Sequence, residues 1–263
     1  MAKTCEGPHI AVKLVKITVC QLHSSGEALQ LDWARLMAHA RSNATELVLL
    51  PEMPFYPWLA LSPSFNPRSW QEAVDAHDRW ERHFPEISPA ALAATRPVDF
   101  GNGRNDEAFL WDGRHGVRSI HAKSKLENRE GAWESAWYVS SPADFTPVEV
   151  ATSVAAFLIG AELFDTGAGG QYARDGVTLL LVPRSTPEAE SDRWLRAASD
   201  AARRGRCVLA SSNCATGGGG WLIDPQGKLV ASTNESQPFV TLDLAIPRSP
   251  QPTCTRNESH MFG

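Results

Sequence analysis

Residues 157–170 read FLIGAELFDTGAGG, and this stretch joins an apolar run to a polar, glycine-rich turn. The run is typical of a buried β-strand, and it breaks at Gly160, at the strand end where α/β enzymes often hold a reactive side chain. We expect a short helix at 171–175 and a second apolar strand, VTLLLVP, at 177–183. The stretch therefore predicts a βαβ unit.

The N-terminal part of the chain repeats this alternation. The segments VKITVCQL (15–22) and LVLLPE (47–52) are expected strands, the second buried on both faces. Between them, apolar residues at helical spacing from Glu27 onward predict an amphipathic helix. A further helix is expected over 69–84 with Ser69 as its cap, because Glu72 follows three residues later.

Hairpins complete the pattern. EAFLWD and VRSIHAK flank the turn GRHG, a helix is expected over 190–204, and RCVLASSN, GWLIDPQGKLVAS and FVTLDLA are expected strands. With no break in composition, we expect one α/β domain over 1–263 with helices covering the sheet. The Pro-rich segment from about 247 should run over the surface or reach a partner subunit.

Composition excludes several classes of protein. A net charge of −5 and a pI near 5.9 indicate no nucleic-acid partner, and no apolar window is long enough for a membrane helix or a signal peptide. The five cysteines are odd in number and form no C-x-x-C pair, so neither disulfides nor a zinc site is indicated. We therefore expect a cytoplasmic protein without a metal or cofactor.

Two tempting motifs have ordinary explanations. Asp165, Thr166 and Gly167 spell the Asp-Thr-Gly of an aspartic protease, but that chemistry needs two such loops and the chain has one. We interpret it as a turn. The glycine-rich segments match neither a P-loop nor a dinucleotide fingerprint, and His121 is interpreted as a polar strand residue.

Three charged residues stand at positions where charge is costly. Glu52 ends a buried strand, where a carboxylate costs several kcal/mol of desolvation unless it is paired or functional. Lys123 ends the strand VRSIHAK, and Glu134 lies among bulky aromatic residues in GAWESAWY. A structural ion pair or helix cap at Glu52, and an exposed strand-end lysine at Lys123, remain the alternatives.

These residues belong to four longer segments. They are LVLLPEMPFYPW, HAKSKLENREGAWESAWY, FLIGAELFD with GVTLLLVPRSTP, and SSNCATGGGGWLIDPQGKLVAS. In this order, over nearly the whole chain, they resemble the nitrilase, or carbon-nitrogen hydrolase, superfamily. The resemblance implies a four-layer α-β-β-α sandwich and Glu-Lys-Cys chemistry on a small amide or nitrile.

The resemblance also implies a role for each position. Glu52 matches the general base, Lys123 the residue that stabilises the oxyanion together with the backbone N–H of Ala161, and Glu134 a second glutamate that positions the substrate and the lysine. The cysteine nucleophile's place is held by Gly160. Without a nucleophile, covalent turnover should fall by up to about 10⁶-fold.

Other residues are weak substitutes for that cysteine. Cys207 is interpreted as a buried small residue and Cys214 as a loop residue, and carboxylates such as Glu162 and Asp165 are poor nucleophiles toward amides. A second departure is Glu127, where the family usually has proline. That difference concerns the local turn rather than the site.

Three hypotheses follow. The chain is a carbon-nitrogen hydrolase scaffold that has lost its nucleophile; or a pseudoenzyme that binds a small carbonyl compound or regulates a paralogue; or a protein in which Glu52 activates water directly. Four aromatic residues are expected to line the pocket, and the resemblance implies a homodimer or higher homo-oligomer. These aromatic residues are Tyr56, Trp58, Trp133 and Trp137.

Overall fold

The computed structural model describes residues 13–100 and 103–246. The strands of this part are β1 (Lys13–Leu22), β2 (Leu47–Leu49), β3 (Ala91–Phe100), β4 (Gly103–Asp112), β5 (Gly116–Ala122), β6 (Val148–Val150), β7 (Ser153–Phe157), β8 (Leu179–Pro183), β9 (Val208–Cys214), β10 (Trp221–Ile223), β11 (Leu229–Ser232) and β12 (Phe239–Ile246). The α-helices are α1 (Gly26–Ser42), α2 (Pro67–Glu81), α3 (Glu134–Trp137), α4 (Thr166–Arg174) and α5 (Ser191–Gly205). Short 3₁₀ turns cover Leu59–Leu61, Phe84–Ile87, Gly160–Phe164 and Glu188–Glu190.

The strands form one hydrogen-bonded path that folds into two facing sheets. Its order is β5-β4-β3-β2-β1-β9-β8-β7-β6, with β12 beside β1 and the β10–β11 hairpin beside β9. The two halves meet where the last residues of β1 pair with the last residues of β9, Gln21 with Asn213 and Leu22 with Cys214. Away from that junction the two sheets separate and pack face to face.

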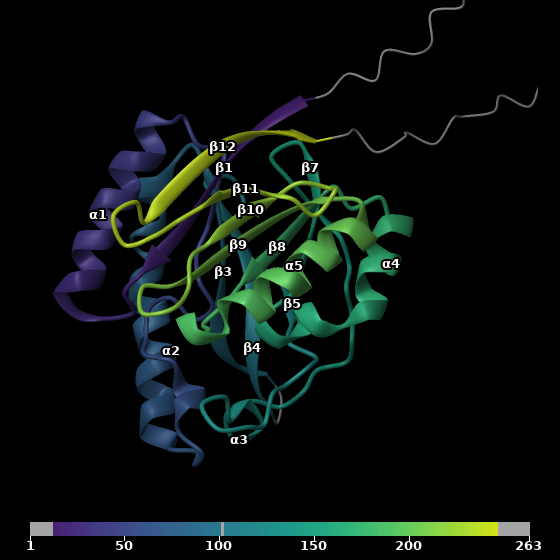
Figure 1. Ribbon diagram of the computed structural model, residues 1–263. Helices are drawn as coiled ribbons and strands as arrows, with labels where there is room; N and C mark the ends of the chain where they lie inside the picture. The colour runs from purple at the N-terminus through teal and green to yellow at the C-terminus, as the bar shows by residue number, and fades with distance from the viewer. Residues whose placement is uncertain (1–12, 101–102, 247–263) are drawn as a thin grey trace, which may run out of the picture.

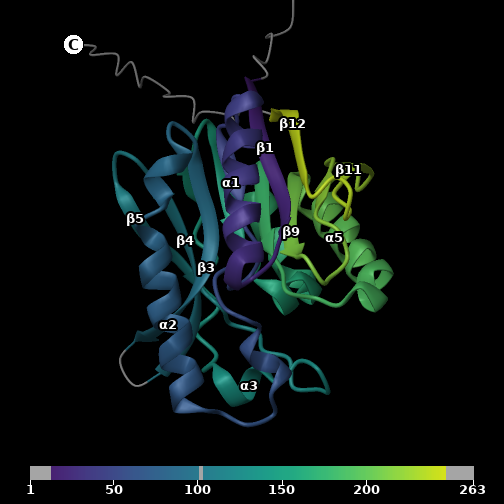
Figure 2. The ribbon, with the colours of Figure 1, turned by 90° about the vertical axis from the view of Figure 1, so that its left-hand side faces the viewer.

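Three apolar cores hold four layers together. Side chains of β1, β2, β7 and β8, among them Ile17, Leu49, Phe157 and Leu181, form the core between the sheets. A second core joins one sheet to α1, and a third joins the other sheet to α4 and α5. Figures 1 and 2 show α1 and α2 on one outer side and α5 on the other. The α-β-β-α sandwich is confirmed.

Strand direction brings distant segments to one edge. β2 runs parallel to β1 and β3, and β5 is related to β3 by two antiparallel steps, so β2 and β5 end on the same side. β7 is parallel to β8, β8 to β9, and β9 to β1. The segments that follow β2, β5 and β7 therefore lie at a common edge.

Most expected elements are present, and two boundaries are corrected. The cap of α2 is Asn66, whose Oδ1 accepts from the backbone N–H groups of Arg68 and Ser69, so Ser69 lies inside the helix. The helix expected at 171–175 begins earlier, at Thr166, because Asp165 caps it by accepting from Gly167 N. The Asp-Thr-Gly motif is thus a helix start.

One central strand has no counterpart in the sequence-based prediction. β3 contains the alanine-rich run ALAAT and Pro97, and neither favours a strand. Pro97 is tolerated because β2 pairs only with residues 91–93 of β3, so no β2 residue requires the N–H that proline lacks. Pairing with β2 and β4, rather than local preference, puts this segment in the sheet.

Two further expectations from the sequence concern the C-terminal segment and membrane-spanning helices. The segment from 247 lies outside the described residues. Within the described part, no helix combines the length and the apolar character that crossing a membrane requires.

Candidate active site

Lys123 lies at the centre of the shared edge, completely buried. Its Nζ is 2.6 Å from Oε1 of Glu52 and 2.6 Å from Oε1 of Glu134. Glu52 follows β2, Lys123 follows β5, and Glu134 is the first residue of α3. The structure therefore brings together three of the sequence-predicted site residues that are far apart in the chain.

Backbone donors orient both glutamates. The N–H of Ser185, just after β8, donates to Oε2 of Glu52, and the N–H of Glu127 donates to Oε2 of Glu134 at 2.8 Å. A proline at position 127 would have no N–H to donate. The departure at Glu127 thus provides a hydrogen bond that holds Glu134.

Burial and charge act in opposite directions on these groups. Burial raises the pKa of Glu52 well above its ordinary value and also raises the pKa of Glu134, although Lys123 opposes both shifts. Burial by itself would lower the pKa of Lys123, but Glu134, Glu52 and Asp106 together raise it. Lys123 therefore remains an ammonium ion throughout the physiological range.

Asp106 is a fourth member of this cluster that sequence reasoning missed. Its side chain is fully buried in β4, with Oδ2 4.0 Å from Lys123 Nζ. Both carboxylate oxygens have no hydrogen-bond partner among the described residues. Strand alternation would have indicated it, because Asp106 shares a strand face with Ala108 and Leu110, which lie in the core between the sheets.

Gly160 faces this cluster. Its φ of +48° lies in the left-handed region, which favours glycine. A Cβ atom at this position would lie 3.0 Å from Lys123 Nζ and 2.8 Å from Glu52 Oε2. A side chain at position 160 would therefore project directly between the lysine and the glutamate. Ala161, the expected oxyanion donor, is the next residue of the same buried turn.

A second ion pair fixes the turn that carries Gly160. His121 Nε2 lies 2.8 Å from Glu162 Oε2, both side chains buried, and His121 Nδ1 lies 2.7 Å from the carbonyl oxygen of Asp144. Glu162 also accepts from the N–H of Ile159 and from the N–H and hydroxyl of Ser124. His121, interpreted from the sequence as an ordinary strand residue, thus helps to bind this turn to the end of β5.

Arg184 holds the opposite wall of the site. Its buried guanidinium donates to Ser211 Oγ, Thr186 Oγ1 and the carbonyl oxygen of Gly219, each at 2.7 Å, and stacks on the ring of Trp221. Burial lowers its pKa to about 9, so it stays charged at neutral pH. These bonds position the loop that begins with Ser185.

Two neighbouring cavities border the cluster. A small one of about 70 Å³ is bordered by Glu52, Glu134 and Gly160, and a larger one of about 380 Å³ also reaches Glu52. Trp58 lines both, 5.6 Å from Lys123 Nζ, and Tyr56 lines the larger. The two cavities share Glu52, Trp58 and Ser185 in their walls, so they are neighbours at the charged cluster.

The other two expected aromatic residues lie elsewhere. Neither Trp133 nor Trp137 borders these cavities. Trp137 is buried against Phe65, and its Nε1 donates to the carbonyl oxygen of Ser62. Its indole is part of the packing under α3, because the one polar atom of the ring has a backbone partner there.

The cysteines of the described part divide clearly by environment. Cys20 and Cys207 are buried, and burial raises the pKa of both thiols, that of Cys207 to about 12. Cys214 is partly exposed and lines the 380 Å³ cavity together with Glu52. Only Cys214 among these three borders the site.

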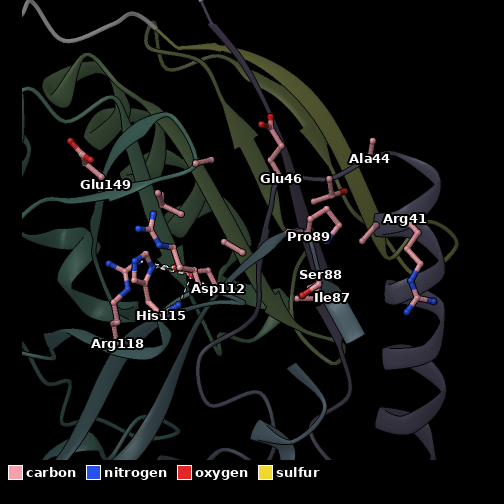
Figure 3. Close-up of a pocket in the computed structure, with 17 residues that line it drawn as sticks. Arg41, Ala44, Glu46, Ile87, Ser88, Pro89, Asp112, His115, Arg118 and Glu149 are labelled. Atoms are coloured by element: carbon pink, nitrogen blue, oxygen red, sulfur yellow. Dashed lines mark hydrogen bonds and ion pairs between the residues drawn. The ribbon is translucent and has the colours of Figure 1, made fainter. Parts of the chain in front are cut away.

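A larger cavity of about 880 Å³ lies away from this chemistry. It is bordered by the segments before β2 and β3 and by the β4–β5 and β6–β7 turns, and none of the cluster residues lines it. In Figure 3, Asp112, His115 and Arg118 gather on one side and are joined by polar contacts, while Arg41 stands on the other. Asp112 contacts both His115 and Arg118, and Arg41 donates to the carbonyl oxygen of Glu86.

Within the described residues no group of His, Cys, Asp and Glu side chains is arranged to hold a metal ion. The charged cluster is instead organised around an ammonium group. Its components are a buried cation, carboxylates on two sides, and a facing glycine, Gly160, that supplies no side chain. Such an arrangement can polarise a carbonyl oxygen and move a proton, but it contains no nucleophilic side chain at position 160.

No protein-family model and no curated sequence matches this chain. Solved structures do match. A carbon-nitrogen hydrolase from Helicobacter pylori G27 superposes with a TM-score of 0.77 and 14% identity, covering 88% of this chain and 89% of that one. The fold is that of the nitrilase superfamily.

Amidases share the same architecture. An amidase from Nesterenkonia sp. matches with a TM-score of 0.74 and 19% identity over 92% of this chain and 94% of that one. A glutamate-to-glutamine variant of the amidase from Nesterenkonia sp. AN1 carries the acetamide moiety of fluoroacetamide on its active-site cysteine, with a TM-score of 0.73, 19% identity and coverage of 90% and 92%. At these identities the likeness establishes the fold.

Proposed function

We propose that this chain is a carbon-nitrogen hydrolase scaffold of the amidase or nitrilase type that has no covalent nucleophile. One observation carries the proposal: Lys123 Nζ contacts Glu52 and Glu134 at 2.6 Å and would lie 3.0 Å from a Cβ at Gly160. Amidases of the same fold bind small amides at a cysteine. The substrate class is therefore a small amide or nitrile.

The residues have distinct roles in this proposal. Lys123, with the backbone N–H of Ala161, stabilises negative charge on the substrate's oxygen or nitrogen, and Glu52 accepts and returns protons. Glu134 holds Lys123 in place through its 2.6 Å contact. Since glycine has no atom that can attack carbon, an acyl or thioimidate intermediate does not form, and covalent turnover is lost or very weak.

Restoring the nucleophile tests the proposal. The Gly160→Cys variant, made in a background in which Cys5, Cys214 and Cys254 are replaced by serine, should react with iodoacetamide at neutral pH and hydrolyse at least one member of a panel of small amides and nitriles. The background chain with Gly160 unchanged is the matched control and should do neither, because Cys20 and Cys207 are buried. A folded Gly160→Cys variant that reacts with no reagent and no substrate would contradict the proposal.

A binding role without turnover is the second candidate. It is favoured by the close approach of Glu52, whose Oε2 would lie 2.8 Å from a Cβ at Gly160. The carboxylate thus partly occupies the space of a nucleophile. In this case the parent chain binds a small amide, and Gly160→Cys adds a thiol without adding turnover.

The proposal includes self-association into at least a dimer. Leu229 and Val230 are 38% and 46% exposed on β11, which among the described strands pairs with β10 alone and so lies at an edge. Exposed apolar side chains on a strand edge favour contact with another chain. Light scattering should give at least twice the chain mass, and a monomer would contradict this part of the proposal.

A further inference from the structure

The charges of the buried cluster do not balance. One ammonium group, Lys123, faces three carboxyl groups, at 2.6 Å from Glu52, 2.6 Å from Glu134 and 4.0 Å from Asp106. Glu52 and Glu134 each accept one hydrogen bond from Lys123 and one from a backbone N–H. Asp106 accepts none from any described residue. It adds negative charge without completing a hydrogen-bond network.

The surroundings contain little to offset that charge. His121 and Glu162 pair with each other, and Tyr138 is neutral because burial raises its pKa well above the ordinary value. The Thr95 hydroxyl accepts the Met53 N–H and leaves its own proton near Asp106, where it favours the ionised carboxylate but adds no positive charge. Arg184 is engaged by Ser211, Thr186 and Gly219. Three ionised carboxylates around one cation are too costly in a buried site, so at least one binds a proton.

The remaining charge has a consequence for ligands. Burial raises the pKa of Glu52 well above its ordinary value and that of Asp106 to about 6, so at pH 8 the proton lies on Glu52 and Asp106 is ionised. Ionised Asp106 and Glu134 with one ammonium group then leave a net charge of −1 beside the 70 Å³ cavity at Gly160, and without the charge of Asp106 the cluster would be neutral. A neutral amide entering this cavity brings no charge. A carboxylate of the same shape would be a further anion in a water-poor site, where like charges repel strongly.

We propose that Asp106 is a specificity-determining residue, which makes the site accept a neutral amide and exclude the carboxylate of the same shape. The inference rests on the proposed function, since amide hydrolysis converts a neutral amide and water into a carboxylate and ammonium. The same excess charge that disfavours the acid as a ligand would disfavour it as a product wherever turnover is restored, as in Gly160→Cys. Asp106 acts through the charge of the Lys123 cluster and need not touch the ligand.

Binding to the parent chain tests this without turnover. Two amide and acid pairs of matched shape serve as probes, propionamide with propionate and 3-phenylpropionamide with 3-phenylpropionate, titrated by saturation-transfer NMR at pH 8. We expect the parent to bind each amide at least about tenfold more tightly than its acid. The Asp106→Asn variant should bind the acids about tenfold more tightly than the parent does, with amide affinity little changed.

Controls separate charge from fold. Asp243→Asn removes one negative charge from β12, where the side chain is 52% exposed, and should leave both affinities unchanged. Thermal unfolding verifies that Asp106→Asn is folded, and Asp106→Ser replaces it in the assay if it is not. An acid-to-amide affinity ratio that stays the same in the Asp106 variant would overturn the inference.

The pH dependence of propionate binding distinguishes this role from a purely structural role of Asp106, which would not change it. Burial raises the pKa of Asp106 to about 6, against the pull of Lys123. Between pH 8 and pH 5.5 the parent should gain affinity for propionate as Asp106 takes up a proton, and Asp106→Asn should lose most of that gain. Equal gains in both chains would overturn the inference.

The outcomes distinguish this inference from the proposed function. If the parent binds the amides but does not discriminate against the acids, only the inference about Asp106 is overturned. If neither amide binds to the parent or to Asp243→Asn, the proposed function is overturned as well.

Discussion

The backbone of Gly160 and the carboxylate of Glu52 compete for one space: a Cβ on Gly160 would lie 2.8 Å from Glu52 Oε2 and 3.1 Å from Oε1. This relationship between the two residues links stability to function. Glycine lets the chain turn with a positive φ and lets Glu52 reach Lys123. Any side chain at position 160 must move the end of the Glu52 side chain.

The first prediction concerns this crowding. Gly160→Ala should destabilise the fold by more than the roughly 1–2 kcal/mol that a left-handed backbone costs an L-residue. Gly116→Ala is the matched control, because Gly116 also has a positive φ, +68°, but has no atom within 4 Å of its Cβ position. Urea unfolding measures both. If both variants lose the same free energy of unfolding, the Glu52 side chain moves aside without a cost in stability, and the prediction is wrong.

The second prediction concerns Lys123. Lys123→Met should lower the free energy of unfolding by about 3–5 kcal/mol, because it leaves buried carboxyl groups without their cation. Those carboxyls must then bind protons, so the variant should regain stability as the pH falls from 8 to 5. Lys228→Met, at an exposed turn, should cost little. If Lys123→Met loses no more free energy of unfolding than Lys228→Met, the proposed ion cluster around Lys123 is wrong.

The third prediction concerns the pair of His121 and Glu162. Burial would lower the pKa of His121, but its bond to Glu162 raises it above 6.5, so its contribution is complete below about 6.5 and is lost as the pH rises through the folded-state pKa. Burial would raise the pKa of Glu162, but hydrogen bonds from His121 and Ser124 lower it below 4.5. The stability that ionised Glu162 contributes is therefore lost as the pH falls through its folded-state pKa. The pair should stabilise most between about 4.5 and 6.5.

Urea unfolding at pH 5.5 and 8.5 measures this. His121→Gln should be destabilised more at pH 5.5 than at pH 8.5, so the variant's stability should fall less over that range than the parent's. Glu162→Gln removes the same pair from the other side and should show the same reduction. Parallel pH profiles for the parent and both variants would mean that the pair does not titrate as the geometry indicates.

The fourth prediction concerns thiol access. N-ethylmaleimide should modify Cys214 before Cys20 or Cys207 in the folded protein, because Cys214 alone among these lines a cavity. A bound amide should slow that reaction, whereas Cys207→Ser should leave it unchanged. Peptide mass spectrometry follows each site. Protection of Cys20 or Cys207 in place of Cys214 would contradict the location of the cavity.

Local pattern carries much of the fold. The apolar runs at β1, β7 and β8 and the helical spacing in α1 and α5 predict those elements, because each buried face repeats with the period of its secondary structure. β3 does not follow this pattern, because its alanines and Pro97 have no strand preference of their own. Pairing with β4 along its whole length places it in the sheet.

The candidate site divides in the same way. The sequence by itself indicated that Glu52, Lys123 and Gly160 lie at the ends of apolar runs, and its resemblance to a family suggested why they matter. In the structure all three lie just beyond their strands, which end at Leu49, Ala122 and Phe157. Only the tertiary structure brought Glu52 and Glu134 within 2.6 Å of one ammonium group, added Asp106, and paired His121 with Glu162. Secondary structure follows from neighbours along the chain, whereas the charge and pKa of a buried group depend on contacts between segments that are distant in sequence.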